Sequence, residues 1–242
     1  LQKRLRKLVL DWNKNEETDL SRELLEMYRL YANQFPEDSE MAFWGGNVAR
    51  EIKANREAQA LYHQASEAGA KAIAKGADKK DEKIRTVFEG SLFAEIEMAE
   101  LTKDAKLRDQ AYAHYLALNP NGSKSLEVRY QQAHLVYDRG DYSKAADMFY
   151  QISARDEQCR SKSAPSICRQ AADLTLDSIV ILKNDERLEA TAEEFSSLYP
   201  KWKNEFSTVS RRARLNMAAK AASGTSSSAM GDNLKKLSNL DL

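Results

Sequence analysis

Proline and glycine are scarce in this chain, with 4 and 9 copies among its 242 residues. A β-sandwich or β-barrel needs turn residues after each of its short strands, so this shortage argues against both folds. Alanine, leucine, glutamate and lysine are abundant, and these residues have high helix propensity. The composition therefore predicts an all-α protein, long enough for one or two domains with a buried core.

Long apolar runs and an excess of charge of one sign are also missing. No run approaches the ~20 apolar residues that a membrane-spanning helix needs, so we expect no transmembrane segment. Lysine and arginine together number 37, and aspartate and glutamate also number 37. Because this balance creates no overall basic field, we expect no nucleic-acid partner.

The sequence lacks the short motifs that mark common catalytic sites. It contains no Gly-x-Ser-x-Gly, no His-Glu-x-x-His, no phosphate-binding loop and no glycine-rich dinucleotide turn. We therefore predict a protein that is not an enzyme, and we expect no cofactor and no small-molecule substrate.

Scattered histidines and glutamates offer no recognisable metal motif. The histidines are far apart, and none has a cysteine or second histidine at metal-ligand spacing: His63, His114 and His134. We interpret each as a packed or solvated helical residue rather than a ligand. One acidic cluster could be imagined as a catalytic pair, and it consists of Glu95, Glu97 and Glu100. On a highly charged helix we predict that this cluster is a solvated face.

Three of the four prolines end segments of the same kind. These segments are Tyr31-x3-Phe35-Pro36, Tyr115-x3-Asn119-Pro120 and Phe195-x3-Tyr199-Pro200. Thirteen residues after each of these prolines stands an alanine, namely Ala49, Ala133 and Ala213. The pattern predicts a repeat of helix, proline turn, and a helix with a small residue where a neighbour packs closely. The alternative is coincidence among common residue types.

Periodicity and turn residues predict eleven helices, which make five antiparallel pairs and one unpaired helix. We expect them at about 1–13, 18–34, 39–55, 55–76, 81–102, 106–118, 124–139, 142–155, after Pro165, 185–198 and 202–221. Residues 1–221 would form one helical repeat domain. Residues 222–242 would form a flexible linker and a short leucine-containing tail. Because the chain begins with Leu1, we expect it to be part of a longer protein.

The best-conforming stretch resembles the tetratricopeptide repeat. It runs Tyr130-x2-Ala133-x3-Tyr137-x2-Gly140-Asp141-Tyr142-x2-Ala145-x3-Phe149. The stretch meets most of the family signature: the small residue of the first helix (Ala133), the Gly-x-Tyr (Gly140 and Tyr142), the alanine (Ala145) and the aromatic residue (Phe149). Arg129 stands where the family has a tryptophan. The resemblance implies a right-handed α-solenoid of stacked antiparallel helix pairs, with a concave surface for a protein or peptide partner.

The proline-terminated helix ends are similar to a variant found in Gram-negative envelope proteins. The run from Ala111 to Ile152 is most like the gliding-motility repeat proteins of that group. This resemblance implies a location in the periplasm or cell envelope, with the cytoplasm as the alternative.

Candidate partner-binding residues lie on the first helix of the best repeat. Spacings of three and four residues place Tyr130, His134 and Tyr137 on one face. In the other two copies, Arg50 and Arg214 take the position of His134. One basic or ring-bearing residue per copy would suit an acidic or C-terminal peptide segment. The alternative is that the tyrosines belong to the core and the arginines are ordinary surface charges.

The two cysteines, Cys159 and Cys168, bracket a polar loop that contains Pro165. We predict a disulfide between them, which favours an oxidising compartment. The alternative is a pair of free thiols in a reducing cytosol.

These observations predict a non-catalytic scaffold that binds a protein or peptide partner in the bacterial envelope. Two alternatives remain open. The chain could be the helical superstructure of a larger enzyme, such as a peptidoglycan-cleaving one, or a cytosolic adaptor.

Overall fold

The chain is all-helical wherever its structure is described. The computed structural model describes residues 1–15, 21–161 and 165–238, and for 224–238 it describes the backbone alone. These ranges contain eleven α-helices and no strand, which confirms the predicted all-α class and the predicted number of helices. None of these helices is long and apolar enough to cross a membrane.

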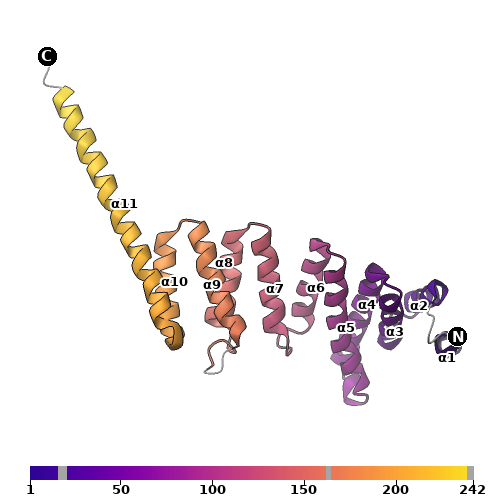
Figure 1. Ribbon diagram of the computed structural model, residues 1–242. Coiled ribbons are helices and arrows are strands. Elements are labelled where there is room, and N and C mark those ends of the chain that lie inside the picture. The colour runs from indigo at the N-terminus through magenta and orange to yellow at the C-terminus, as the bar shows by residue number, and fades with distance from the viewer. Residues whose placement is uncertain (16–20, 162–164, 239–242) are drawn as a thin grey trace. The chain divides into compact units, whose positions relative to one another are not determined.

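The residues form two compact units, Leu1–Val128 and Arg129–Leu242. The helices of the first unit are α1 (Gln2–Asn15), α2 (Arg22–Gln34), α3 (Ser39–Glu51), α4 (Asn55–Ala74), α5 (Lys83–Leu101) and α6 (Ala105–Leu118). A 3-10 turn at Ala77–Lys79 precedes α5. Each helix of this unit packs against the next, as Figure 1 shows. Short connections make such neighbours antiparallel.

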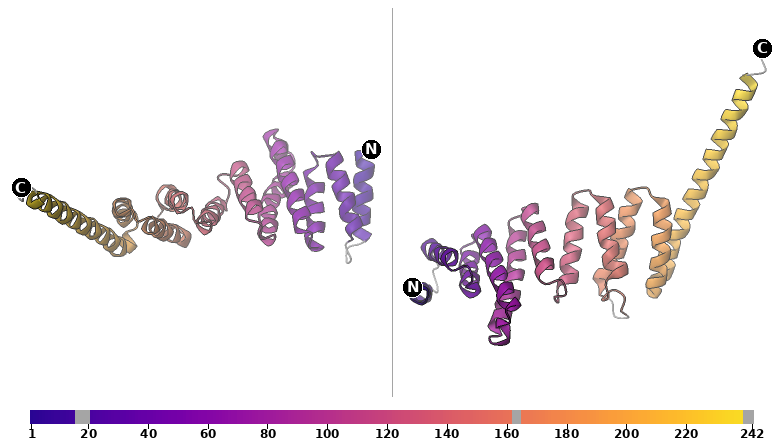
Figure 2. Two further views of the ribbon diagram at one scale, coloured as in Figure 1. Left: turned by 90° about the horizontal axis from the view of Figure 1, so that it is seen from above. Right: turned by 180° about the vertical axis from the view of Figure 1, so that it is seen from behind.

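Helix α7 (Ser125–Asp138) begins in the first unit and ends in the second. The other helices of the second unit are α8 (Tyr142–Tyr150), α9 (Ser166–Ile181), α10 (Asp185–Leu198) and α11 (Lys203–Ser238). A π-helical turn at Gln151–Arg155 extends α8, and a 3-10 turn at Pro200–Trp202 precedes α11. Helices α8 to α11 also contact one another in succession (Figure 2).

The last helix is longer than predicted. We expected a helix over 202–221 followed by a linker, whereas α11 continues to Ser238. The residues from Ala222 to Ser238 include no proline, so nothing in that stretch removes a backbone donor from the helical ladder. The final residues of the predicted tail, 239–242, lie outside the described part of the chain.

Four helix pairs are joined by the same short turn. One residue with positive φ ends the first helix of each pair, and these residues are Lys53, Lys103, Gly140 and Lys183. Three of the four are followed by an aspartate or asparagine whose side chain caps the second helix: Asp104, Asp141 and Asn184. Glycine adopts positive φ without strain, which explains Gly140 between the helices predicted over 124–139 and 142–155.

The three proline segments also share one conformation. The backbone N–H groups of Phe35, Asn119 and Tyr199 each donate to the carbonyl four residues earlier, over 2.9, 2.8 and 2.9 Å. Their φ angles are −130°, −139° and −121°. This shared geometry shows that the sequence repeat marks a repeated structural junction.

Small residues allow the helices to approach closely. The three alanines that follow the proline turns, Ala49, Ala133 and Ala213, are each 0% exposed. On α3, a Cβ added to Gly46 would lie 2.6 Å from the ring of Tyr62 on α4. Such a distance is well inside van der Waals contact, so the packing of α3 on α4 requires glycine at this position.

The predicted disulfide is present. Cys159 and Cys168 are joined, with their Cα atoms 5.3 Å apart, and both side chains are buried. The bond ties the segment after the π-helical turn to the first turn of α9. Residues 162–164 of the enclosed loop lie outside the described part of the chain.

Replacing Gly46 by alanine should destabilise the protein by about 1–3 kcal/mol, because the added methyl group would overlap the Tyr62 ring. Gly90 on α5 offers a matched control, since a Cβ there would meet Phe43 at an ordinary 3.6 Å. Gly90→Ala should leave stability unchanged or raise it by up to ~1 kcal/mol. Urea denaturation measures both variants, and equal effects would contradict this account of the helix contact.

Reduction of the disulfide should lower the free energy of unfolding by roughly 2–3 kcal/mol, because the cross-link restricts the unfolded chain. Denaturation with and without dithiothreitol measures the difference. The double variant Cys159→Ala/Cys168→Ala serves as the control and should not respond to the reductant. An unchanged midpoint for the reduced native sequence would rule out a stabilising bond.

Candidate functional site

Three of the predicted partner-binding residues form one aromatic surface on α7. The ring of His134 lies 5.8 Å from that of Tyr130 and 6.1 Å from that of Tyr137. All three rings are partly exposed. They surround Phe149 of α8, whose ring lies 5.6, 6.2 and 6.3 Å from those of Tyr130, His134 and Tyr137.

The aromatic surface is supported from beneath. Phe149 is 0% exposed, and Tyr142 packs edge-on against Tyr137 with 5.1 Å between ring centroids. Burial raises the pKa of both Tyr130 and Tyr137. The two tyrosines are therefore partly buried, in contact with the fully buried ring of Phe149.

The two predicted arginines, Arg50 and Arg214, differ from this surface because each contacts a carboxylate. Arg50, in the first unit, is exposed, and its Nε is 3.9 Å from the carboxylate of Glu51. Arg214, on α11, donates to Glu189 over 2.5 Å. His134 faces Asp138 at 3.4 Å. Each of these basic side chains thus already has an acidic neighbour on its own unit.

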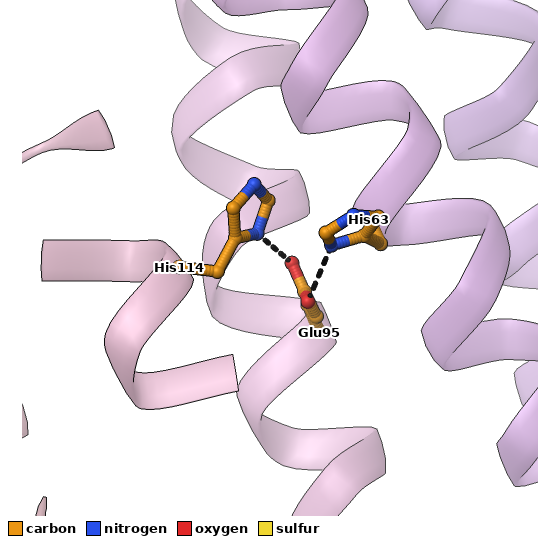
Figure 3. A group of neighbouring side chains, drawn as sticks. All are labelled: His63, Glu95 and His114. Carbon is orange, nitrogen blue, oxygen red and sulfur yellow. Dashed lines mark hydrogen bonds and ion pairs between the residues drawn. The ribbon is translucent and has the colours of Figure 1, made fainter. Parts of the chain in front are cut away.

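The structure also brings together a polar cluster that the sequence did not predict. It consists of His63 on α4, Glu95 on α5 and His114 on α6, all in the first unit (Figure 3). His63 and His114 are 51 positions apart in the chain, but their ring centroids are 4.1 Å apart. This cluster is called the His–Glu–His cluster below.

Glu95 corrects our prediction of a solvated acidic face. Glu97 and Glu100 are exposed as expected, whereas Glu95 is 1% exposed. The reason is that α5 contacts α3, α4 and α6, so it is covered on more than one side. A signal was present in the sequence, because apolar residues stand three and four positions away on the same helix face, namely Leu92, Met98 and Ala99.

The carboxylate of Glu95 lies between the two imidazoles. Its Oε1 is 2.9 Å from His63 Nδ1, and its Oε2 is 2.7 Å from His114 Nδ1. Gln59 Nε2 donates to Oε1 over 3.3 Å. Because a buried carboxylate without partners would be costly, these contacts explain how Glu95 is tolerated inside the helix stack.

A second carboxylate faces the other nitrogen of His114. Glu67 Oε1 is 3.1 Å from His114 Nε2, and Lys71 Nζ is 3.6 Å from Glu67 Oε2. Acceptors therefore face both nitrogens of the His114 ring. The ring satisfies both when it carries two protons, because the imidazolium form donates from each nitrogen.

These contacts shift the pKa values of the cluster. Burial alone would raise the pKa of Glu95, but the hydrogen bonds from His114 and His63 outweigh it and the pKa is lowered. Burial would likewise lower the pKa of His114, but Glu95 and Glu67 outweigh it and the pKa is raised. Glu67 has a lowered pKa, chiefly through its hydrogen bond with His114. The cluster therefore favours a charged imidazole between charged carboxylates.

Comparison with known proteins adds no family to this description. No protein-family model matches the chain, and no curated protein matches it. The resemblance to tetratricopeptide repeats therefore remains a prediction based on the sequence pattern.

The stabilising effect of Glu95 should depend on pH. Its lowered pKa gives stability that is present above the ordinary value of 4.5 and lost as the pH falls. The raised pKa of His114 gives stability that is present below the ordinary value of 6.5 and lost as the pH rises through the folded-state pKa. Glu95→Gln should therefore cost most between these two values, by about 1–3 kcal/mol, and less on either side.

Denaturation with urea across this pH range, in buffer containing a chelator, measures the profile. Glu97→Gln is the matched control, because it removes an exposed carboxylate from the same helix. That variant should change stability by no more than about 0.5 kcal/mol at any pH. A Glu95→Gln profile parallel to that of the native protein would show that the ion pair does not form.

Proposed function

We propose that this protein is a non-catalytic scaffold whose helical hairpins bind another protein. The observation that carries the proposal is the recurrence of one hairpin turn at Lys53, Lys103, Gly140 and Lys183. A single hairpin cannot bury its apolar stripe alone, so repeated hairpins are typical of proteins in which neighbours stack. Stacked repeats offer extended surfaces, and binding to other polypeptides is their common use.

We extend the proposal to a right-handed α-solenoid of the tetratricopeptide type. Within each unit, contacts between consecutive helices support it. So do the alanines at equivalent positions after the proline turns, Ala49, Ala133 and Ala213, which are fully buried in all three copies. The proline junctions between copies have matching backbone conformations.

The aromatic surface of α7 is the best-supported contact site for a partner. Tyrosine is enriched in protein interfaces because it offers a large rigid surface with a polar end. Tyr130, His134 and Tyr137 present such rings, held from below by Phe149. The basic residues Arg50 and Arg214 already have acidic neighbours, so the rings support the proposal more strongly than the charges do.

We propose the periplasm or cell envelope as the compartment. The Cys159–Cys168 disulfide supports an oxidising environment, because such bonds are rare in reducing cytosol. The similarity of the proline turns to those of envelope repeat proteins points in the same direction.

Site-specific photo-crosslinking tests the proposed surface. A photoreactive phenylalanine analogue is placed at His134 in one variant and at Lys144 in another, and each is irradiated in extract of the source cells. Lys144 is the control, because it is exposed on the second helix of the same hairpin. We expect a discrete crosslinked partner from position 134 alone, and Tyr137→Ala should weaken binding of that purified partner about tenfold or more.

Equal crosslinking from both positions would place the contact elsewhere on the hairpin. Unchanged affinity of the Tyr137→Ala variant, with its helical circular dichroism retained, would exclude the aromatic surface as the binding site.

A further inference from the structure

The His–Glu–His cluster offers the donor atoms of a metal site. The ligand atoms of His63, Glu95 and His114 all lie within 4.8 Å of one another. Two imidazole nitrogens and one carboxylate oxygen form a ligand set that suits zinc, and a water molecule as fourth ligand would complete its tetrahedral coordination. We propose that these three residues bind one divalent transition-metal ion, with Zn²⁺ as the best-fitting ion.

The three ligand atoms lie within 4.8 Å of one another, so side-chain adjustments of about an ångström would close the site. Donor atoms on one tetrahedral zinc ion are about 3.4 Å apart, because each lies about 2.0–2.2 Å from the metal. The two Nδ1 atoms already face the two oxygens of Glu95 at 2.9 and 2.7 Å (Figure 3). The ion would lie between these atoms, and His63, with a side chain 48% exposed, can adjust its rotamer.

The surroundings favour a defined site. Each ligand comes from a different helix, and α5 packs directly against both α4 and α6. Glu95 is almost fully buried, which fixes the carboxylate at the centre. The exposure of His63 leaves access for the ion and room for a water molecule as fourth ligand. A helical framework of this kind holds ligands more accurately than a loop.

Glu67 would act as a positioning residue rather than a ligand. Its carboxylate accepts from Nε2 of His114 and so leaves Nδ1 directed at Glu95. Metal-bound histidines commonly donate their second N–H to a carboxylate, which fixes the tautomer and the ring orientation. On metal binding, the Nδ1 protons of His114 and His63 would leave to solvent, the neutral His63 ring would keep its proton on Nε2, and each Nδ1 would donate its lone pair to the ion.

Calorimetric titration of the untagged, chelator-treated full chain with ZnCl₂ tests the site. We expect one ion per chain, and a melting temperature that rises with zinc concentration. Glu67→Gln should weaken zinc binding by about 10- to 100-fold, the loss typical of a residue that hydrogen-bonds a metal ligand. His63→Ala and His114→Gln should each weaken it by more than that, because each removes a ligand. Co²⁺ in place of Zn²⁺ should give the visible absorption of a tetrahedral ion in the native chain but not in the His63→Ala or His114→Gln variant.

Glu97→Gln is the matched control, because it removes an exposed carboxylate from the helix that carries Glu95 but lies outside the cluster. That variant should bind zinc as the native chain does. His63→Ala is the most informative variant, since the side chain of His63 is 48% exposed and that of His114 only 11%, and Gln59 still donates to Glu95 when the imidazole is removed. Absence of binding to the native chain, or equal binding by a well-folded His63→Ala variant, would overturn the proposal.

Discussion

The close approach of consecutive helices over small residues is the constraint on which the rest of this structure depends. Helix α3 packs on α4 where Gly46 faces Tyr62, and also on α2, where Gly45 faces Tyr28. The three alanines that follow the proline turns are buried to the same extent. A short hairpin has little core of its own. It becomes stable because closely packed helices bury its apolar side chains against the neighbouring hairpins.

That closeness also explains the polar chemistry of the first unit. Helix α5 is enclosed by α3, α4 and α6, so a carboxylate on it is removed from water unless neighbouring helices supply partners. His63 and His114 supply them from either side of Glu95. The second unit has a different arrangement, in which Tyr130 and Tyr137 lie over buried Phe149 and remain partly exposed. One packing principle thus supports a charged cluster in one unit and an aromatic surface in the other.

The sequence predicted the local features well, because their causes are local. The proline turns, the helix end at Gly140 and the number of helices follow from residues within a few positions of each other. The His–Glu–His cluster was missed because its members are 32 and 19 positions apart and meet only through helix packing. The length of α11 was missed for another reason, since small polar residues after Ala222 are compatible with both a linker and a helix. The aromatic surface was predicted in part. Spacing placed its three rings on one face of a helix, whereas the contribution of Phe149 on α8 came from helix packing.

A double-mutant cycle between Gly46 and Tyr62 tests most directly whether close helix contact organises this fold. Gly46→Ala is measured by urea denaturation in the native background and in a Tyr62→Leu background. If the alanine methyl group overlaps the tyrosine ring, its cost should fall in the second background, with a coupling energy of about 0.5–3 kcal/mol. Costs that agree within about 0.3 kcal/mol in the two backgrounds would mean that the contact does not constrain the helices.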